Sequence, residues 1–309
     1  MRFETIKLRE DNPNVTLTAY ILDDSAEMLN GAERPAVLIC PGGGYLYCSD
    51  REAEPIAMRF ASMGYHAFVL RYSVYYSSYT EMSYDSKLSP KQGVGFPYCI
   101  QDMGLAMKYM YEHAEEWKLD KARIALSGFS GGAVNCALYG VYWDKPIVKD
   151  FLGVAEGYAP AAMVLGYGVY DNCGFDGNEQ ILLFQDLNDA YLTALTGEEA
   201  PGEAVRHTVS AARLADSAFP PSFLWSTYED DAVPVRQTVS LADRLIKIGV
   251  PVEVHIFESG IHGLSLATQA TAMARSNILP EIAVWIDMAD RWLCKRMPLP
   301  LPGKMMWET

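Results

Sequence analysis

The sequence predicts an α/β protein with a mostly parallel central sheet and helices on both of its faces. Short apolar, β-branched runs alternate with segments of helical character along the 309 residues. One such run, Arg123–Ser127, leads through a glycine directly into a helical segment. Glycine-containing loops follow other runs, at the sheet edge where open α/β folds bind ligands. We therefore expect the functional residues in the loops at this edge.

The expected elements follow one another in a regular order. Strands are expected at Val15–Leu22, Ala36–Cys40, Ala67–Tyr72, Arg123–Ser127, Ala161–Gly166, Ser222–Thr227 and Val252–Glu258. Helices are expected at Glu54–Met63, Cys99–Trp117, Gly132–Tyr142, Pro234–Ile248 and Pro280–Arg296. Gly64 and Gly249 end two of these helices, because glycine readily adopts the left-handed conformation found after a helix C-terminus.

Two long segments interrupt this alternation. Ser73–Pro97 is rich in serine, glycine and tyrosine, and contains Tyr75, Tyr76, Tyr79 and Tyr84. Asp171–Ala218 has a polar middle and is expected to form a small helical insertion. Loops of this length are either functional lids or simply mobile, and the sequence leaves both possibilities open. We expect a single domain over residues 1–309, with the insertion at about residues 171–218.

The composition argues against several classes of partner. The chain has 25 Lys and Arg against 39 Asp and Glu, a net charge of −14, which disfavours nucleic acid and anionic membrane surfaces. The six cysteines show no C-x-x-C pair and no metal-ligand spacing, so we expect free thiols and no metal. The N-terminus lacks the apolar core of a signal peptide, and no run approaches the ~18 apolar residues of a membrane span. A cytoplasmic protein is expected.

The motif Gly128-Phe129-Ser130-Gly131-Gly132 places one serine between a strand and a helix. Glycines two residues before and two residues after the serine allow the sharp turn that exposes a nucleophilic hydroxyl. The N-terminus of the following helix offers the backbone N–H of Gly131 to a developing oxyanion. Ser130 is the predicted nucleophile.

A nucleophilic serine needs a histidine as its base. Of the five histidines, His262 lies in the glycine-flanked loop that directly follows the last core strand. This position puts it at the same sheet edge as Ser130. The other four histidines are expected to be solvated or packed: His66, His113, His207 and His255.

The histidine needs an acid to orient it, and three aspartates are candidates. Asp230 and Asp231 follow the preceding strand at the same edge, and Asp230 is preferred. Asp231 is the alternative acid, and a second interpretation of the pair is an N-cap for the helix that begins near Pro234. Asp171, after the Ala161–Gly166 strand, is the third candidate.

The loop Pro41-Gly42-Gly43-Gly44-Tyr45 follows an early strand and is the expected source of a second oxyanion donor. It matches no phosphate-binding pattern, because the chain has neither a G-x-x-x-x-G-K-[ST] nor a G-x-G-x-x-G motif. Serine, aspartate and histidine occur in this order, with the glycine loop before them. This joint arrangement predicts a serine hydrolase.

These residues resemble the α/β-hydrolase superfamily, in which nucleophile, acid and histidine follow one another in the same order. The glycine loop, Arg51–Pro55 and Phe68–Tyr72 are similar to the acetyl-esterase and acetylxylan-esterase-like branch, a relative of the hormone-sensitive-lipase type. The resemblance implies Ser130 as nucleophile, Asp230 as acid and His262 as base. It implies an oxyanion hole formed by the N–H groups of Gly43, Gly44 and Gly131.

The chain departs from that branch after the serine. The turn around the nucleophile, here residues 128–132, is called the elbow. In the branch the elbow and the residues after it commonly read G-F-S-A-G-G-H, whereas this chain has Gly131, Ala133 and Val134 in place of the alanine, the third glycine and the histidine. Gly132 is retained, so the geometry of the nucleophile should be preserved.

We expect a serine esterase for short-chain carboxylic esters, with acetyl esters of carbohydrates as the favoured substrates and no cofactor. The alternatives are a peptidase or amidase with the same triad, and a non-catalytic homologue that only binds a ligand. The partner is a small-molecule ester such as an acetylated oligosaccharide. A homo-oligomer is compatible with the sequence.

Overall fold

A computed structural model describes residues 1–82, 87–175, 181–182 and 185–304. Tyr84 and parts of the 171–218 segment lie outside these residues. The sheet contains β1 (Arg2–Lys7), β2 (Thr16–Ile21), β3 (Arg34–Cys40), β4 (His66–Arg71), β5 (Leu119–Phe129), β6 (Ala162–Gly166), β7 (Ser222–Thr227) and β8 (Val252–Phe257). Its spatial order is β1-β2-β4-β3-β5-β6-β7-β8.

β1 pairs with β2 and β2 with β4 in antiparallel fashion, and all other neighbours are parallel. The predicted α/β class with a mostly parallel sheet is confirmed. The carboxyl ends of β3, β5, β7 and β8 therefore meet at one edge, and the loops that follow these strands carry the candidate site residues.

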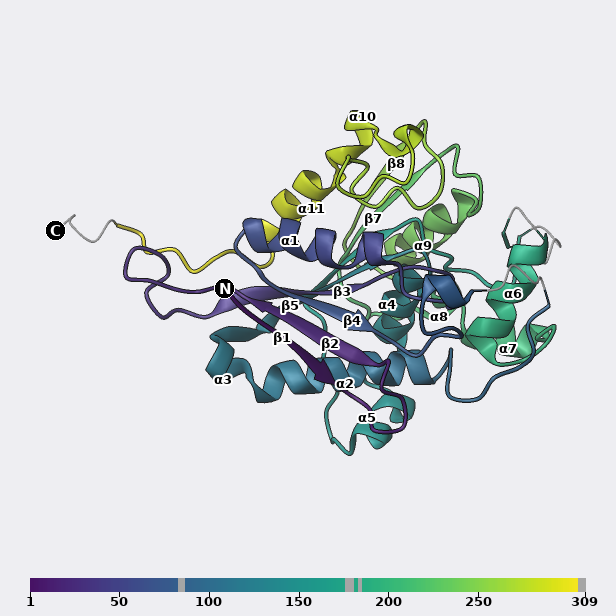
Figure 1. Ribbon diagram of the computed structural model, residues 1–309, viewed down its shortest axis with the longest axis horizontal. Helices are drawn as coiled ribbons and strands as arrows, with labels where there is room; N and C mark the ends of the chain where they lie inside the picture. The colour runs from purple at the N-terminus through teal and green to yellow at the C-terminus, as the bar shows by residue number, and fades with distance from the viewer. Residues whose placement is uncertain (83–86, 176–180, 183–184, 305–309) are drawn as a thin grey trace.

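Helices cover both faces of the sheet (Figure 1). The longer ones are α1 (Glu54–Ser62), α2 (Tyr98–Glu112), α4 (Gly131–Tyr142), α6 (Gln185–Thr196), α9 (Arg236–Lys247) and α11 (Trp285–Cys294). The shorter ones are α3 (Ala114–Trp117), α5 (Pro146–Leu152), α7 (Glu203–Thr208), α8 (Ala211–Leu214) and α10 (Pro280–Ala283). Single 3₁₀ turns are η1 (Asp50–Glu52), η2 (Tyr79–Glu81) and η3 (Arg275–Asn277).

The central strands are buried on both faces, and alternate side chains enter two hydrophobic cores. In β3, Leu38 packs into the core beneath α2, α4 and α9, whereas Val37 and Ile39 pack into the core beneath α1 and α11. This follows from the two-residue period of a strand. Strands of this kind hold the loops at their ends in fixed positions.

Several predicted boundaries need correction. β1 and α5 were not predicted from the sequence. The predicted helix over Cys99–Trp117 breaks at His113 into α2 and α3, and the closing helix breaks at Val284 into α10 and α11. The helical character predicted for the 171–218 segment agrees with the structure, because the segment contains α6, α7 and α8.

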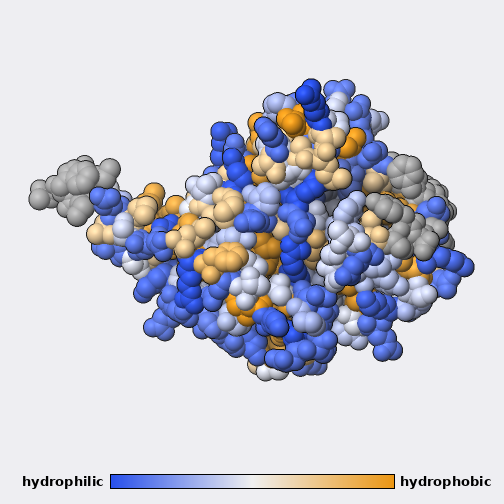
Figure 2. Space-filling view, in the orientation of Figure 1, coloured by the Kyte–Doolittle hydropathy of each residue, from blue (hydrophilic) through white to orange (hydrophobic). Residues whose placement is uncertain are grey.

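On the face drawn in Figure 2, hydrophilic residues predominate and apolar residues form small, separate patches. Among the helices that the structure describes, none is both long and apolar enough to span a bilayer. All six cysteines lie in the described residues and are free thiols.

Candidate active site

Ser130 lies at the turn between β5 and α4. Its backbone has φ 48° and ψ −121°, a conformation that a non-glycine residue adopts only when its surroundings enforce it. The Ser130 N–H donates to the Gly166 carbonyl at 3.0 Å, which ties the turn to the end of β6. This is the strained strand-to-helix turn that raises a serine side chain above a sheet edge.

The two glycines that flank the turn are required by close backbone contacts. A Cβ atom at Gly128 would lie 2.4 Å from the Gly132 carbonyl oxygen, and one at Gly132 would lie 2.0 Å from the Cys40 carbonyl oxygen. Both distances are far below van der Waals contact. Each position therefore excludes a side chain, as the sequence motif predicts.

The structure brings Ser130, His262 and Asp230 together from three loops. Ser130 Oγ lies 2.9 Å from His262 Nε2. His262 Nδ1 lies 2.9 Å and 3.1 Å from the two carboxylate oxygens of Asp230. An ionised carboxylate only accepts hydrogen bonds, so Nδ1 carries the proton and Nε2 is left to accept from the serine hydroxyl.

Asp230 is well suited to orient the imidazole. Its side chain is buried, and its Oδ1 also accepts the N–H groups of Ala232 at 3.0 Å and Val233 at 2.8 Å. These bonds fix the carboxylate at the start of the segment leading to α9.

The two other candidate acids do not contact the imidazole. Asp231 accepts the backbone N–H of His262 at 2.9 Å. Asp171 forms an ion pair with Arg213 at 2.9 Å.

The charge state of His262 is set by opposing effects. Burial favours the neutral imidazole, but nearby carboxylates, Asp230 foremost, favour the charged form. The net result is that the pKa of His262 is raised above its ordinary value. An acid partner that stabilises the imidazolium is what a general base needs when it takes a proton from serine.

The glycine loop after β3 lies against the elbow. Gly43 and Gly44 have positive φ values of 118° and 60°. A Cβ atom at Gly131 would lie 3.0 Å from the Gly44 nitrogen and 3.1 Å from the Tyr45 nitrogen. Backbone nitrogens of the glycine loop thus face the first residue of α4, and Gly43, Gly44 and Gly131 all line the cavity at Ser130.

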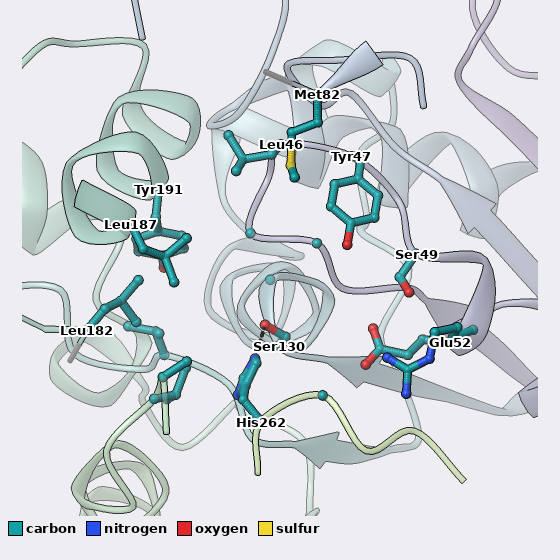
Figure 3. Close-up of a pocket in the computed structure, with 18 residues that line it drawn as sticks. Leu46, Tyr47, Ser49, Glu52, Met82, Ser130, Leu182, Leu187, Tyr191 and His262 are labelled. Carbon is teal, nitrogen blue, oxygen red and sulfur yellow. Dashed lines mark hydrogen bonds between the residues drawn. The ribbon is translucent and has the colours of Figure 1, made fainter. Parts of the chain in front are cut away.

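This cavity has a volume of about 290 Å³. Figure 3 shows Ser130 and His262 facing each other at its base. In the same view (Figure 3) Leu182, Leu187 and Tyr191 lie on one side of Ser130, and Ser49 and Glu52 lie on the other. The lining also includes the apolar residues Leu46, Met82, Val169 and Val233 and the cation Arg51. Leu187 and Tyr191 belong to α6, so the predicted insertion contributes to the wall.

The 73–97 loop also reaches this region. Its backbone is tied to the glycine loop, because Tyr75 N–H donates to the Tyr45 carbonyl at 2.8 Å and Tyr76 N–H donates to the Leu46 carbonyl at 2.7 Å. Met82 from this loop lines the cavity.

Glu52 lines the cavity and Tyr167 packs against His262, and neither residue was singled out from the sequence. Glu52 accepts hydrogen bonds from Gly42 N–H at 2.8 Å and from Tyr167 O–H at 2.6 Å. The Tyr167 ring packs edge-on against His262, with 5.1 Å between ring centroids. The only sequence signal for Glu52 is its place in the Arg51–Pro55 segment.

Among the described residues, no group of three or more His, Cys, Asp and Glu side chains is arranged to hold a metal ion.

Three of the four histidines that we expected to be solvated or packed make contacts with other residues of the fold. His66 Nδ1 accepts the Leu22 N–H at 3.1 Å, and the His113 ring stacks on Tyr109 with centroids 3.9 Å apart. His255 Nε2 lies 3.0 Å from Glu253 Oε1.

Similar structures cover almost the whole chain. The carboxylesterase Cest-2923 from Lactobacillus plantarum WCFS1 has a TM-score of 0.79 and 28% identity, over 98% of this chain and 100% of that chain. An acetyl ester-xyloside bifunctional hydrolase from Caldicellulosiruptor lactoaceticus has a TM-score of 0.72 and 27% identity, over 94% of this chain and 96% of that chain. The chain is homologous to carboxylesterases.

The chain is also similar to part of a longer protein. Endo-1,4-beta-xylanase B of Butyrivibrio fibrisolvens is 27% identical over 256 residues, which are 81% of this chain. The chain spans 35% of the length of that relative.

The family comparison agrees with the fold. The mostly parallel, eight-stranded sheet has the α/β-hydrolase arrangement. The BD-FAE family model matches residues 26–245, which include the glycine loop, the elbow and Asp230 but end before His262. The chain belongs to the BD-FAE family of α/β-hydrolases.

Proposed function

We propose that this protein is a serine esterase that hydrolyses short-chain carboxylic esters, with acetyl esters of carbohydrates as its substrates. The observation that carries the proposal is the pair of contacts that links Ser130 Oγ, His262 and Asp230 at the base of a cavity. The homology to carboxylesterases supports the reaction class.

In the proposed reaction, His262 Nε2 takes the proton of the Ser130 hydroxyl as the oxygen attacks the ester carbonyl. Asp230 keeps Nδ1 protonated and stabilises the imidazolium that forms. The N–H groups of Gly43, Gly44 and Gly131 stabilise the oxyanion of the tetrahedral intermediate. The imidazolium then donates its proton to the departing alcohol, and an acyl-enzyme remains.

Water completes the cycle. His262 takes a proton from a water molecule, which attacks the acyl carbon. As the second tetrahedral intermediate collapses, the bond to Ser130 Oγ breaks, the imidazolium returns its proton to that oxygen and the carboxylic acid is released. Apart from the substrate and water, these steps use only side chains and backbone groups of this chain.

The cavity supports a small substrate. Its volume of about 290 Å³ lies at the lower limit of the usual range for ligand pockets, which suits a short acyl group. The polar side at Ser49 and Arg51 suits a hydroxyl-rich alcohol. The carbohydrate assignment is further supported by the acetyl ester-xyloside hydrolase and the xylanase among the relatives.

Two assays test the proposal. The first compares kcat/KM for p-nitrophenyl acetate, butyrate and octanoate, and acetate is expected to be the best of the three. A preference for octanoate would contradict the short-acyl assignment. The second measures acetate released from acetylated xylo-oligosaccharides, and no release would contradict the carbohydrate assignment.

A fluorophosphonate probe separates the alternatives. The probe is expected to label the wild-type protein and not Ser130→Ala. In a steady-state assay the same substitution is expected to lower kcat by a factor on the order of 10⁴ or more. An unlabelled wild-type protein would favour a non-catalytic binding role. Faster turnover of a p-nitroanilide than of the matching ester would indicate an amidase.

A further inference from the structure

One buried carboxylate beside the cavity has no part in the proposed reaction. Glu52 lies in η1, is 3% exposed and lines the cavity that contains Ser130. Burying a carboxylate is costly unless its oxygens are hydrogen-bonded. Both oxygens of Glu52 are satisfied by uncharged donors, and these two donors belong to different loops of the site.

The first donor is the N–H of Gly42, at 2.8 Å from Glu52 Oε2. Gly42 immediately precedes the two glycines proposed to bind the oxyanion. A Cβ atom at Gly42 would lie 2.6 Å from Glu52 Oε2 and 2.9 Å from Ser130 Cβ, so the carboxylate and the elbow both press on this residue. Glu52 thereby fixes where the glycine loop enters the site.

The second donor is the hydroxyl of Tyr167, at 2.6 Å from Glu52 Oε1. The same hydroxyl oxygen accepts the N–H of Ser265 at 3.0 Å, three residues beyond His262. Ser265 Oγ in turn donates to the Arg51 carbonyl at 2.6 Å. Glu52 is thus joined through one side chain to the loop that carries the histidine.

We propose that Glu52 is a positioning residue that holds the glycine loop and the His262 loop at the separation needed for catalysis. The proposal rests on the esterase function proposed above. The carboxylate touches neither Ser130 Oγ nor the imidazole nitrogens, and it acts through Gly42 and Tyr167.

The charge of Glu52 also affects His262. The charged and titratable groups around the imidazole are Asp230 and Asp231 after β7, Glu52 and Arg51 in η1, and Tyr167 after β6. Of these, Asp230 raises the pKa of His262 most, and Glu52 and Asp231 contribute in the same direction against the effect of burial. Loss of the Glu52 charge therefore lowers the pKa of His262.

Glu52→Gln is the most informative variant. Its amide oxygen can still accept the Gly42 N–H, but the charge is gone and the amide nitrogen now faces the Tyr167 hydroxyl. We expect kcat for p-nitrophenyl acetate to fall about 10- to 100-fold with KM within about threefold, because the lost placement is needed in the transition state. The acid limb of kcat/KM is expected to move to lower pH.

Glu54→Gln is the matched control. Glu54 lies two residues further on, at the exposed start of α1, and makes neither of these contacts. It is expected to keep the wild-type kcat and pH profile. A second variant, Tyr167→Phe, keeps the carboxylate and the Gly42 bond but removes the link to Ser265, and kcat is expected to fall about three- to tenfold with the acid limb unchanged.

The outcomes separate the two proposals. A wild-type protein without esterase activity contradicts the proposed function, and the role of Glu52 falls with it. An active wild type with unchanged kcat and acid limb in Glu52→Gln contradicts the role of Glu52 alone. If Glu52→Gln does not fold, an unchanged kcat in Tyr167→Phe overturns the proposal.

Discussion

The carboxylate of Asp231 accepts a hydrogen bond from the backbone N–H of His262 at 2.9 Å. The neighbouring Asp230 accepts a hydrogen bond from Nδ1 of the same residue's imidazole, also at 2.9 Å. Consecutive aspartates therefore hold one histidine by its main chain and by its side chain. Both aspartates face the loop after β8, so the sequence alone leaves Asp231 as an alternative acid. The two different contacts distinguish them.

The two aspartates are expected to differ strongly when each is changed to asparagine. Asp230→Asn removes the carboxylate that keeps Nδ1 protonated, and kcat should fall on the order of 10²- to 10⁴-fold. Asp231→Asn retains an oxygen that accepts the His262 N–H, so its loss should stay below about tenfold. Steady-state assays with p-nitrophenyl acetate measure both, and a larger loss at Asp231 would reassign the acid.

The activity should fall as the pH is lowered through the pKa of His262. The imidazole must be neutral to accept the proton of Ser130, and its pKa is raised above the ordinary value of about 6.5. The acid limb of kcat/KM is therefore expected above about pH 6.5. A limb well below that pH would show that the carboxylates do not stabilise the imidazolium in solution.

Gly132→Ala should destabilise the fold strongly. The new methyl group would have to lie 2.0 Å from the Cys40 carbonyl oxygen, so the backbone of β3 or α4 must move. We expect a loss of about 2–4 kcal/mol in the free energy of unfolding. The control is Gly202→Ala, where φ is −69° and a Cβ atom meets no other atom within 4 Å. Urea unfolding of both variants measures the difference, and equal stabilities would refute the close approach at Gly132.

His66 should make the fold less stable in mild acid. Burial lowers the pKa of His66 to about 4, so the folded protein leaves it neutral while the unfolded chain takes up a proton below about pH 6.5. Stability should therefore decrease as the pH falls from about 6.5 to 4. His66→Asn retains an acceptor for the Leu22 N–H and should show a flatter stability curve in this window. A parallel pH dependence in both proteins would contradict this assignment.

The features predicted correctly from the sequence are those with a local signature. The Ser130 turn is defined by residues two positions away on each side, and the core strands are defined by continuous apolar runs. β1 was missed because it is a half-exposed antiparallel edge strand without such a run. The break at His113 was missed because no proline or glycine marks it.

The contacts of Glu52 were beyond sequence reasoning for a different reason. Glu52 and Tyr167 are 115 residues apart and meet only because β3 and β6 both end at the same edge of the sheet. Neither residue belongs to a recognisable spacing pattern. Their pairing depends on the completed topology of the sheet.

The close crossing of the backbone at Gly132 and Cys40 limits how this enzyme can be engineered. The elbow and the glycine loop are packed main chain against main chain, so randomising them would mostly yield chains that do not fold. Libraries aimed at new acyl or alcohol groups should instead vary Met82, Leu182 and Leu187, which line the cavity from segments outside the central sheet. Variants at these three positions are expected to differ in the substrates they accept and to leave the contacts among Ser130, His262 and Asp230 unchanged.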